Sequence, residues 1–188
     1  MAPPHITLII GPMFSGKSTY LLSFERRFLL TPNKILVIKH VFDTVRYSAT
    51  HVATHTGETS QTQSLNVSKL GEIPQAVLEA SDVILIDEGQ FFDDLSEWVT
   101  FIGTRSNKPR HIVIAGLSGD YKQQNFKSIA EVISQVDTIV HLKSTCSVCG
   151  VDAPFTTRLS GGENTADQTL IGSSDFYQPR CRSHITLK

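Results

Sequence analysis

The chain of 188 residues has no excess of positive charge, since 17 Lys and Arg face 18 Asp and Glu. Proteins that bind nucleic acid through its phosphates depend on clustered basic residues, so this balance argues against a nucleic-acid partner. A long hydrophobic run is also lacking. The apolar stretch at residues 6–10 has no basic flank and is far shorter than the roughly 20 residues that cross a bilayer. We therefore expect no membrane partner and interpret this stretch as a buried strand.

Cysteine is scarce: Cys146, Cys149 and Cys181 all lie near the C-terminus. An odd number cannot pair completely into internal disulfides, which favours a reducing compartment and thiols that bind a metal. Two residues separate Cys146 from Cys149, and two separate Cys181 from His184. Three thiolates and one imidazole suit tetrahedral Zn²⁺ in a closed structural site. We expect this metal to hold together a tail that is too small to fold alone.

Short apolar runs alternate with segments of helical periodicity over most of the chain. Strands are predicted at 6–10, 35–38, 83–86, 112–115 and 139–142, and helices at 16–31, 70–80 and 95–102. In the first helix, the residues expected to share one face are Tyr20, Leu21, Phe24 and Phe28. This alternation is typical of an α/β protein with a parallel sheet and flanking helices.

The composition changes after residue 143 to Cys, Gly, Ser and Thr, with β-prone pieces such as 154–159. We therefore expect two domains, an α/β domain at 1–143 and a small C-terminal domain at 144–188. The polar stretch 43–64 has no sustained period and predicts a long loop, functional or disordered. His40, His51 and His55 lie in or near it, and without a second ligand pair we interpret them as surface or lid residues.

Residues 11–18 match the phosphate-loop pattern G-x-x-x-x-G-K-S between an apolar strand and an amphipathic helix. The glycines let backbone N–H groups converge on phosphate oxygens, and the helix N-terminus favours anions. Lys17 would reach the β- and γ-phosphates of ATP, and the Ser18 hydroxyl would hold Mg²⁺. A chance glycine turn is the alternative. The predicted ATP contacts are Gly11, Pro12, Met13, Phe14, Ser15, Gly16, Lys17, Ser18, Asp87 and Gln90.

Two acids, Asp87 and Glu88, follow the strand predicted at 83–86. They would lie at the carboxyl edge of the sheet, where open α/β sheets bind ligands. Asp87 is the predicted Mg²⁺ partner. Because adjacent side chains diverge at a strand end, Glu88 can face a nucleophile and act as the general base for a hydroxyl. The alternatives are that Glu88 caps a helix starting near Asp93 or faces water.

The segment between the two metal-ligand pairs holds Gly161, Gly162 and Gly172. Its composition permits close approach of the backbone to a ligand, and it equally fits an exposed ribbon tip. Arg46 and Arg158 are both candidates for stabilising the transferred phosphoryl charge, and the spacing does not choose between them.

Gly11-Pro-Met-Phe-Ser-Gly-Lys-Ser18, Asp87-Glu-Gly-Gln-Phe-Phe92 and the paired metal ligands together resemble the zinc-containing thymidine kinases of cytosol, bacteria and large viruses. The resemblance covers nearly the whole chain. It implies a phosphate-loop fold with a zinc ribbon and a lasso loop, and ATP, Mg²⁺ and Zn²⁺ as cofactors. It assigns the base to Glu88 and the metal-associated acid to Asp87. It also implies a cytoplasmic homotetramer with thymidine triphosphate as feedback inhibitor.

The same resemblance implies where the nucleoside binds. Thymine would lie beneath the loop carried by the zinc ribbon, in contact with Gln168, Thr169, Leu170, Ile171, Gly172 and Tyr177. The pocket around its 5-methyl group would be lined by Met13, Phe91, Leu117, Tyr121 and Thr156. One methyl group is worth only about 1 to 3 kcal/mol, so deoxyuridine is expected as a second substrate.

Two positions depart from the family pattern. Thr56 follows the Thr54-His55 pair where many relatives have an acid, and Ser118 follows Leu117 where many have Asp. The first departure concerns a contact from the lid to the metal or its waters. The second concerns how the loop of Tyr121 is held.

We therefore predict transfer of the γ-phosphate of ATP to the 5′-hydroxyl of thymidine, with Glu88 accepting the proton. Positioning and charge neutralisation would supply most of the acceleration. One alternative is an ATPase with a zinc ribbon that acts on nucleic acid, against which the missing basic patch counts. Another is a non-catalytic nucleotide-binding module, against which the presence of Lys17, Ser18 and both acids counts.

Overall fold

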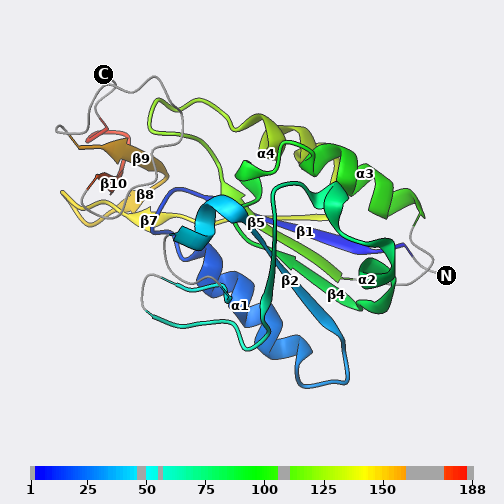
Figure 1. The fold of residues 1–188 in the computed structure, drawn as a ribbon. Helices are drawn as coiled ribbons and strands as arrows, with labels where there is room; N and C mark the ends of the chain where they lie inside the picture. The colour runs from blue at the N-terminus through cyan, green and yellow to red at the C-terminus, as the bar shows by residue number, and fades with distance from the viewer. Residues whose placement is uncertain (1–2, 46–49, 55–56, 106–110, 160–175, 186–188) are drawn as a thin grey trace.

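The computed structural model describes residues 3–45, 50–54, 57–105, 111–159 and 176–185. This part of the chain forms a six-stranded sheet with helices on both faces (Figure 1). Neighbouring strands are parallel throughout, in the order β3-β2-β4-β5-β1-β6. The strands are β1 (His5–Gly11), β2 (Ile35–His40), β3 (Ser64–Val67), β4 (Val83–Ile86), β5 (His111–Leu117) and β6 (Thr138–His141). The predicted α/β class is confirmed.

Each face of the sheet carries its own hydrophobic layer, because successive side chains of a strand point to opposite sides. On β1, Leu8 packs into one layer and Ile9 into the other, and both are fully buried. The Ile9 layer includes α1 (Lys17–Phe28), and the Leu8 layer includes α2 (Gln75–Ala80), α3 (Leu95–Arg105) and α4 (Lys127–Val132). None of the helices in the described ranges is long and apolar enough to cross a bilayer.

Two predicted helices differ from the structure in detail. Tyr20, Phe24 and Phe28 do lie along one side of α1, with rings 5.6 and 6.3 Å apart, but Tyr20 is 39% exposed. The buried residues of the helix are Leu21, Leu22, Glu25 and Phe28. The helix predicted at 70–80 is divided into η2 (Leu70–Glu72) and α2. The break falls at Pro74, because proline restricts the residue before it and is best tolerated at the start of a helix.

Part of the stretch 43–64, predicted as a polar loop, is ordered. η1 (Val41–Val45) extends into its start, and within it Ala53 forms an antiparallel bridge with Thr59. β3, which was not predicted, begins at the last residue of this stretch. It has only four residues at an edge of the sheet, where β2 supplies its partners in parallel register. The short helix α4 was also not predicted, since six residues show little periodicity.

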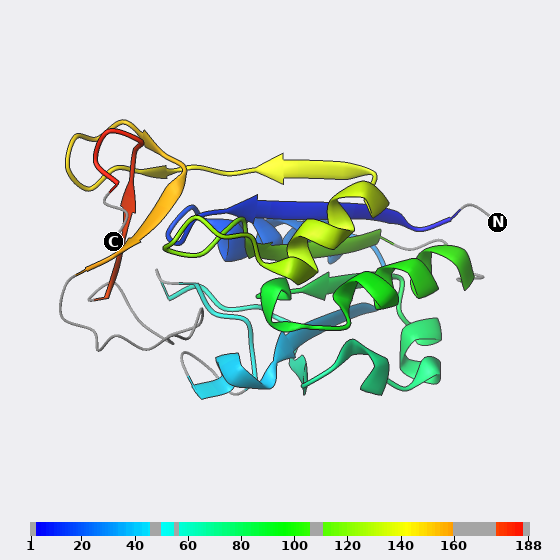
Figure 2. The same cartoon turned by 90° about the horizontal axis from the view of Figure 1, so that it is seen from above.

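Two small antiparallel sheets follow β6. They pair β7 (Ser144–Thr145) with β8 (Asp152–Ala153), and β9 (Phe155–Arg158) with β10 (Tyr177–Arg180). In Figure 2 they lie beyond the carboxyl ends of β1 and β6, whose arrowheads point toward them. The buried cluster in this region consists of Cys146, Ala153 and Cys181. Within the described residues, these small sheets therefore have almost no apolar core of their own.

Candidate active site and metal centre

The phosphate loop turns tightly at both ends. A Cβ added to Gly11 would lie 2.6 Å from the carbonyl oxygen of Leu142, so only glycine fits there. Gly16 is the N-cap of α1 with a φ of 82°, a left-handed conformation that glycine adopts at little cost. The loop therefore leads directly into the N-terminus of α1, where orphan backbone N–H groups favour an anion.

The side chain of Lys17 lies against this loop. Its ammonium Nζ donates to the carbonyl oxygen of Pro12 at 2.7 Å, and the Ser15 hydroxyl donates to the same oxygen at 2.9 Å. Burial lowers the pKa of Lys17, and the nearby carboxylates of Glu88 and Asp87 act in the opposite direction. A phosphate is a stronger acceptor for an ammonium than a neutral carbonyl. The geometry thus keeps a cation in place above the predicted phosphate site.

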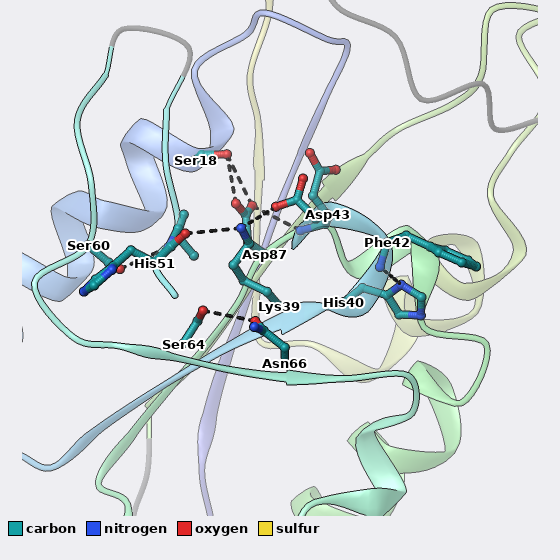
Figure 3. A network of polar contacts seen from close by, with 12 residues as sticks. Ser18, Lys39, His40, Phe42, Asp43, His51, Ser60, Ser64, Asn66 and Asp87 are labelled. Carbon is teal, nitrogen blue, oxygen red and sulfur yellow. Dashed lines mark hydrogen bonds and ion pairs between the residues drawn. The ribbon is translucent and has the colours of Figure 1, made fainter. Parts of the chain in front are cut away.

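Asp87 follows β4 and meets Ser18 at the start of α1 (Figure 3). The Ser18 hydroxyl lies 3.3 and 3.2 Å from the two carboxylate oxygens of Asp87. Burial raises the pKa of Asp87 to about 7, and the charges of Glu88 and Asp43 add to this effect. Hydroxyl and carboxylate oxygens are ligands that Mg²⁺ prefers, and a divalent cation would offset the crowded negative charge. The two residues fit the predicted Mg²⁺ site.

Glu88 has a φ of 53°, an uncommon conformation for a residue with a side chain. Its half-buried carboxylate accepts a hydrogen bond from the Nε2 amide of Gln90. The other amide atom of Gln90, Oε1, accepts the backbone N–H of Leu117 at 3.0 Å. Glu88 makes no side-chain capping bond to η3 (Gly89–Phe91). Gln90, predicted as an ATP contact, thus orients the predicted base, a role that the motif alone did not reveal.

The small C-terminal sheets touch the phosphate loop. The backbone N–H of Met13 donates to the hydroxyl of Thr156 at 3.0 Å. The hydroxyl of Ser144 donates to the carbonyl oxygen of Phe14, also at 3.0 Å. Phe14 has a φ of 62°, which is strained for a bulky residue, so this bond helps to hold a costly conformation. Thr156, a predicted nucleoside contact, therefore touches the loop predicted to bind ATP.

The side chains predicted to surround the base come from several elements. The rings of Tyr121 and Tyr177 are 6.4 Å apart, and the guanidinium of Arg158 lies 5.4 Å from the centre of the Tyr121 ring. On another side, Phe91 lies 5.8 Å from the ring of His40. The predicted residues that lie outside the described part of the chain are Arg46, His55, Thr56, Gly161, Gly162, Gln168, Thr169, Leu170, Ile171 and Gly172.

His40 corrects one prediction, since it is buried and not a surface or lid residue. Its Nδ1 accepts the backbone N–H of Phe42 at 3.2 Å, and its Nε2 lies 3.1 Å from the carbonyl oxygen of Ser68. Burial lowers the pKa of His40, which favours the neutral ring. Its position at the end of β2 supplies both backbone partners, which periodicity did not reveal.

The four predicted metal ligands come together. Their ligand atoms all lie within 4.8 Å of one another. Cys149 Sγ is 3.7 Å from Cys181 Sγ, and His184 Nδ1 is 3.8 and 3.2 Å from the sulfurs of Cys146 and Cys181. Zinc–sulfur bonds of about 2.3 Å at tetrahedral angles separate neighbouring sulfurs by about 3.8 Å. The cluster therefore fits Zn²⁺, with all three thiols outside any disulfide.

The strand β1, the glycine-bounded loop and the helix α1, with a buried aspartate directly after β4 in the same sheet, define a phosphate-loop α/β protein. The Cys and His cluster adds a metal-binding ribbon. The thymidine kinase family model matches residues 4–185, and the chain belongs to this family. It is 38% identical over 178 residues to the thymidine kinases of Vaccinia virus strains Ankara and Western Reserve. These matches cover 95% of this chain and 94% of each relative. The family supports the predicted thymidine kinase function and not the nucleic-acid ATPase.

Proposed function

We propose that the protein transfers the γ-phosphate of ATP to the 5′-hydroxyl of thymidine, and of deoxyuridine as a second substrate. The observation that most supports this proposal is the contact between Thr156 and Met13. It joins the ribbon to the phosphate loop at the end of the sheet where Asp87 and Glu88 emerge from β4. A phosphotransferase needs both substrates at one place, because most of its acceleration comes from positioning and charge stabilisation.

In the proposed complex, ATP lies on residues 11–18 with its phosphates toward the N-terminus of α1. Lys17 moves from the Pro12 carbonyl to the β- and γ-phosphates, which are the stronger acceptors. Ser18 and Asp87 would hold Mg²⁺, which when bound would supply positive charge to offset that of the phosphates. A cation at this place would favour the carboxylate form of Asp87.

Glu88 is the proposed general base. As the 5′-oxygen bonds to the γ-phosphorus, the bond from that phosphorus to the β–γ bridging oxygen breaks and ADP leaves. The proton of the 5′-hydroxyl passes to the Glu88 carboxylate, which Gln90 orients through its side-chain amide. The hydrogen bond from Gln90 to Leu117 in turn fixes the amide.

The two parts of the chain are proposed to bind different substrates. We propose residues 1–143 as the ATP-binding domain and 144–188 as the substrate-binding domain. The ribbon, held by zinc on Cys146, Cys149, Cys181 and His184, would carry the segment 168–172 that contacts thymine. Tyr177, Tyr121, Thr156, Met13, Phe91 and Leu117 complete the proposed nucleoside site.

Three further features are proposed on the family resemblance. They are a homotetrameric assembly, a cytoplasmic location and inhibition by thymidine triphosphate. The last has a physical basis in the same site, since one molecule joins the base that the ribbon would bind to the triphosphate that the loop would bind. Such an inhibitor would occupy both subsites at once.

A steady-state assay of the purified protein with MgATP and a panel of nucleosides tests the proposal. We expect phosphorylation of thymidine, slower turnover of deoxyuridine, and little ATP hydrolysis when nucleoside is absent. An ATPase of the alternative class would hydrolyse ATP without nucleoside and would respond to nucleic acid. Hydrolysis that is indifferent to thymidine would refute the kinase assignment.

A further inference from the structure

Lys39, near the end of β2, is among the largest fully buried side chains in the described residues, with 1% of its surface exposed. An ammonium in such a place is costly unless it is paired and hydrogen-bonded. A methionine, the unbranched apolar residue closest in length, would fill most of the same space without this cost. The proposed mechanism makes no use of Lys39, so its presence needs another explanation.

The ammonium of Lys39 joins two segments that are apart in sequence (Figure 3). Its Nζ lies 2.7 Å from the Oδ2 of Asp43 in η1, and both side chains are buried. The same Nζ donates to the backbone carbonyl of His51 at 3.2 Å. Lys39 therefore holds a carboxylate and the start of the segment 50–54 together.

This ion pair lies beside the proposed Mg²⁺ ligands. β2 and β4 pair in parallel, with Ile38 opposite Ile86, and the N–H of Asp87 donates to the Ile38 carbonyl at 3.0 Å. Lys39 and Asp87 thus follow paired positions on adjacent strands. The charge of Asp43 is among the causes that raise the pKa of Asp87, after burial and the charge of Glu88. Because paired positions place their side chains on the same face of a sheet, the Asp43 carboxylate, 2.7 Å from Lys39 Nζ, lies on the face that carries Asp87.

We infer that Lys39 is a positioning residue that holds the carboxylate of Asp43 next to the Ser18–Asp87 pair, where Asp43 supports Mg²⁺ binding from outside its direct ligands. Groups that orient the surroundings of a metal site affect metal affinity nearly as strongly as ligands do. The ion pair with Lys39 also holds the Asp43 carboxylate in place. This inference rests on the proposed Mg²⁺-dependent reaction.

A magnesium titration of kinase activity at saturating ATP and thymidine tests the inference. In Lys39→Met we expect the Mg²⁺ concentration for half-maximal activity to rise about tenfold or more, the usual effect of losing an outer-shell partner. Lys39→Arg keeps the charge and the donors, so it should recover part of the shift. Lys34→Met removes an exposed lysine just before the same strand and should leave the titration unchanged.

The double variant Lys39→Met/Asp43→Asn provides the second arm. It removes both charges, so it folds without the uncompensated buried carboxylate that Lys39→Met alone leaves. If Lys39 acts through Asp43, the double variant shifts the magnesium midpoint no further than Asp43→Asn does. A shift in the double variant that equals the product of the two single shifts would refute action through Asp43.

A different result is expected if Lys39 only stabilises the fold. Thermal stability and the fraction of active enzyme would fall in Lys39→Met while the magnesium midpoint stayed at the wild-type value, and this would overturn the inference. Failure of the proposed function is a separate outcome, since wild-type protein would then show no Mg²⁺-dependent phosphorylation of thymidine at all.

Discussion

The phosphate-loop end of the central sheet and the metal-binding ribbon face each other, yet they are built on different principles. Asp87 is held at the end of β4, whose four residues are completely buried between two hydrophobic layers. In the part of the ribbon that the structure describes, the buried apolar cluster consists of Cys146, Ala153 and Cys181. Burial of apolar surface positions the first region, and metal coordination is available to position the second.

This difference has a consequence for how each region responds to damage. A change at the phosphate-loop end should alter chemistry without unfolding the protein, since the buried strands remain. A change at the metal ligands should release the ribbon, since little else holds it. The hydrogen bonds of Thr156 and Ser144 to the loop are the points where one region can disturb the other.

The largest effect is expected for Glu88→Gln. Glutamine preserves size and polarity but cannot accept the proton, so kcat should fall at least about a hundredfold. Binding of ATP, measured by calorimetry, should be unchanged. Glu97→Gln, on the exposed side of α3, is the matched control and should be neutral. Activity within a few-fold of wild type would remove Glu88 from the role of base.

Cys149→Ser tests the metal-binding ribbon. Metal analysis should show loss of zinc, and the KM for thymidine should rise about tenfold or more, because removing a metal ligand releases the segment it orders. The affinity for ATP should change less, since the loop and α1 belong to the main sheet. Ser183→Ala lies between two ligands and is exposed, so it should change neither quantity. Unchanged thymidine affinity in zinc-free protein would contradict this division.

Asp87→Asn tests whether the buried carboxylate of Asp87 lowers the stability of the metal-free protein. The pKa of Asp87 is raised from 3.8 to about 7, mainly by burial. Between these values the folded protein keeps a proton that the unfolded chain has lost, so stability falls as pH rises through this window. Without Mg²⁺ and nucleotide, the variant should therefore melt higher than wild type at about pH 8, by about 2–4 °C per kcal/mol.

That advantage should shrink as the pH falls toward about 5, where most of the wild-type carboxylate keeps its proton. Added Mg²⁺ should reverse the order, because it stabilises only the protein that binds it well. Asp93→Asn, at an exposed acid nearby, should show no such pH dependence. A wild type that melts higher than Asp87→Asn in metal-free buffer at about pH 8 would show that burial of this charge is not a cost.

The smallest effect is expected at the contact between the two regions. Thr156→Val leaves the Met13 N–H without its partner, which costs about 1–3 kcal/mol and should raise the KM for ATP several-fold. Thr157→Val is a closely matched control, since the neighbouring buried hydroxyl of Thr157 has no hydrogen-bond partner in the described residues. This control should be neutral or slightly stabilising. Equal effects of both variants on ATP would disprove the specific coupling.

Much of the phosphate-loop end of the sheet was predictable, because the sequence patterns that indicate it involve residues close together in the chain. The run at 83–86 predicted β4, and the glycine spacing of the loop predicted the turn between β1 and α1. The four metal ligands were predicted from spacing alone, and they do come together. His40 was wrongly assigned, because its partners Ser68 and Phe42 are supplied by the fold around the end of β2.

By itself, the sequence determined the α/β class, the phosphate loop, the pair of acids after β4 and the metal-ligand set. Each is indicated by short patterns of residues a few positions apart, such as an apolar run or a pair of ligands. Only the tertiary structure decided that Lys39 is buried against Asp43, that Gln90 holds Glu88, and that Thr156 meets Met13. Such contacts depend on how strands and loops are brought side by side and on which polar groups must be paired once water is excluded. No spacing along the chain encodes that requirement.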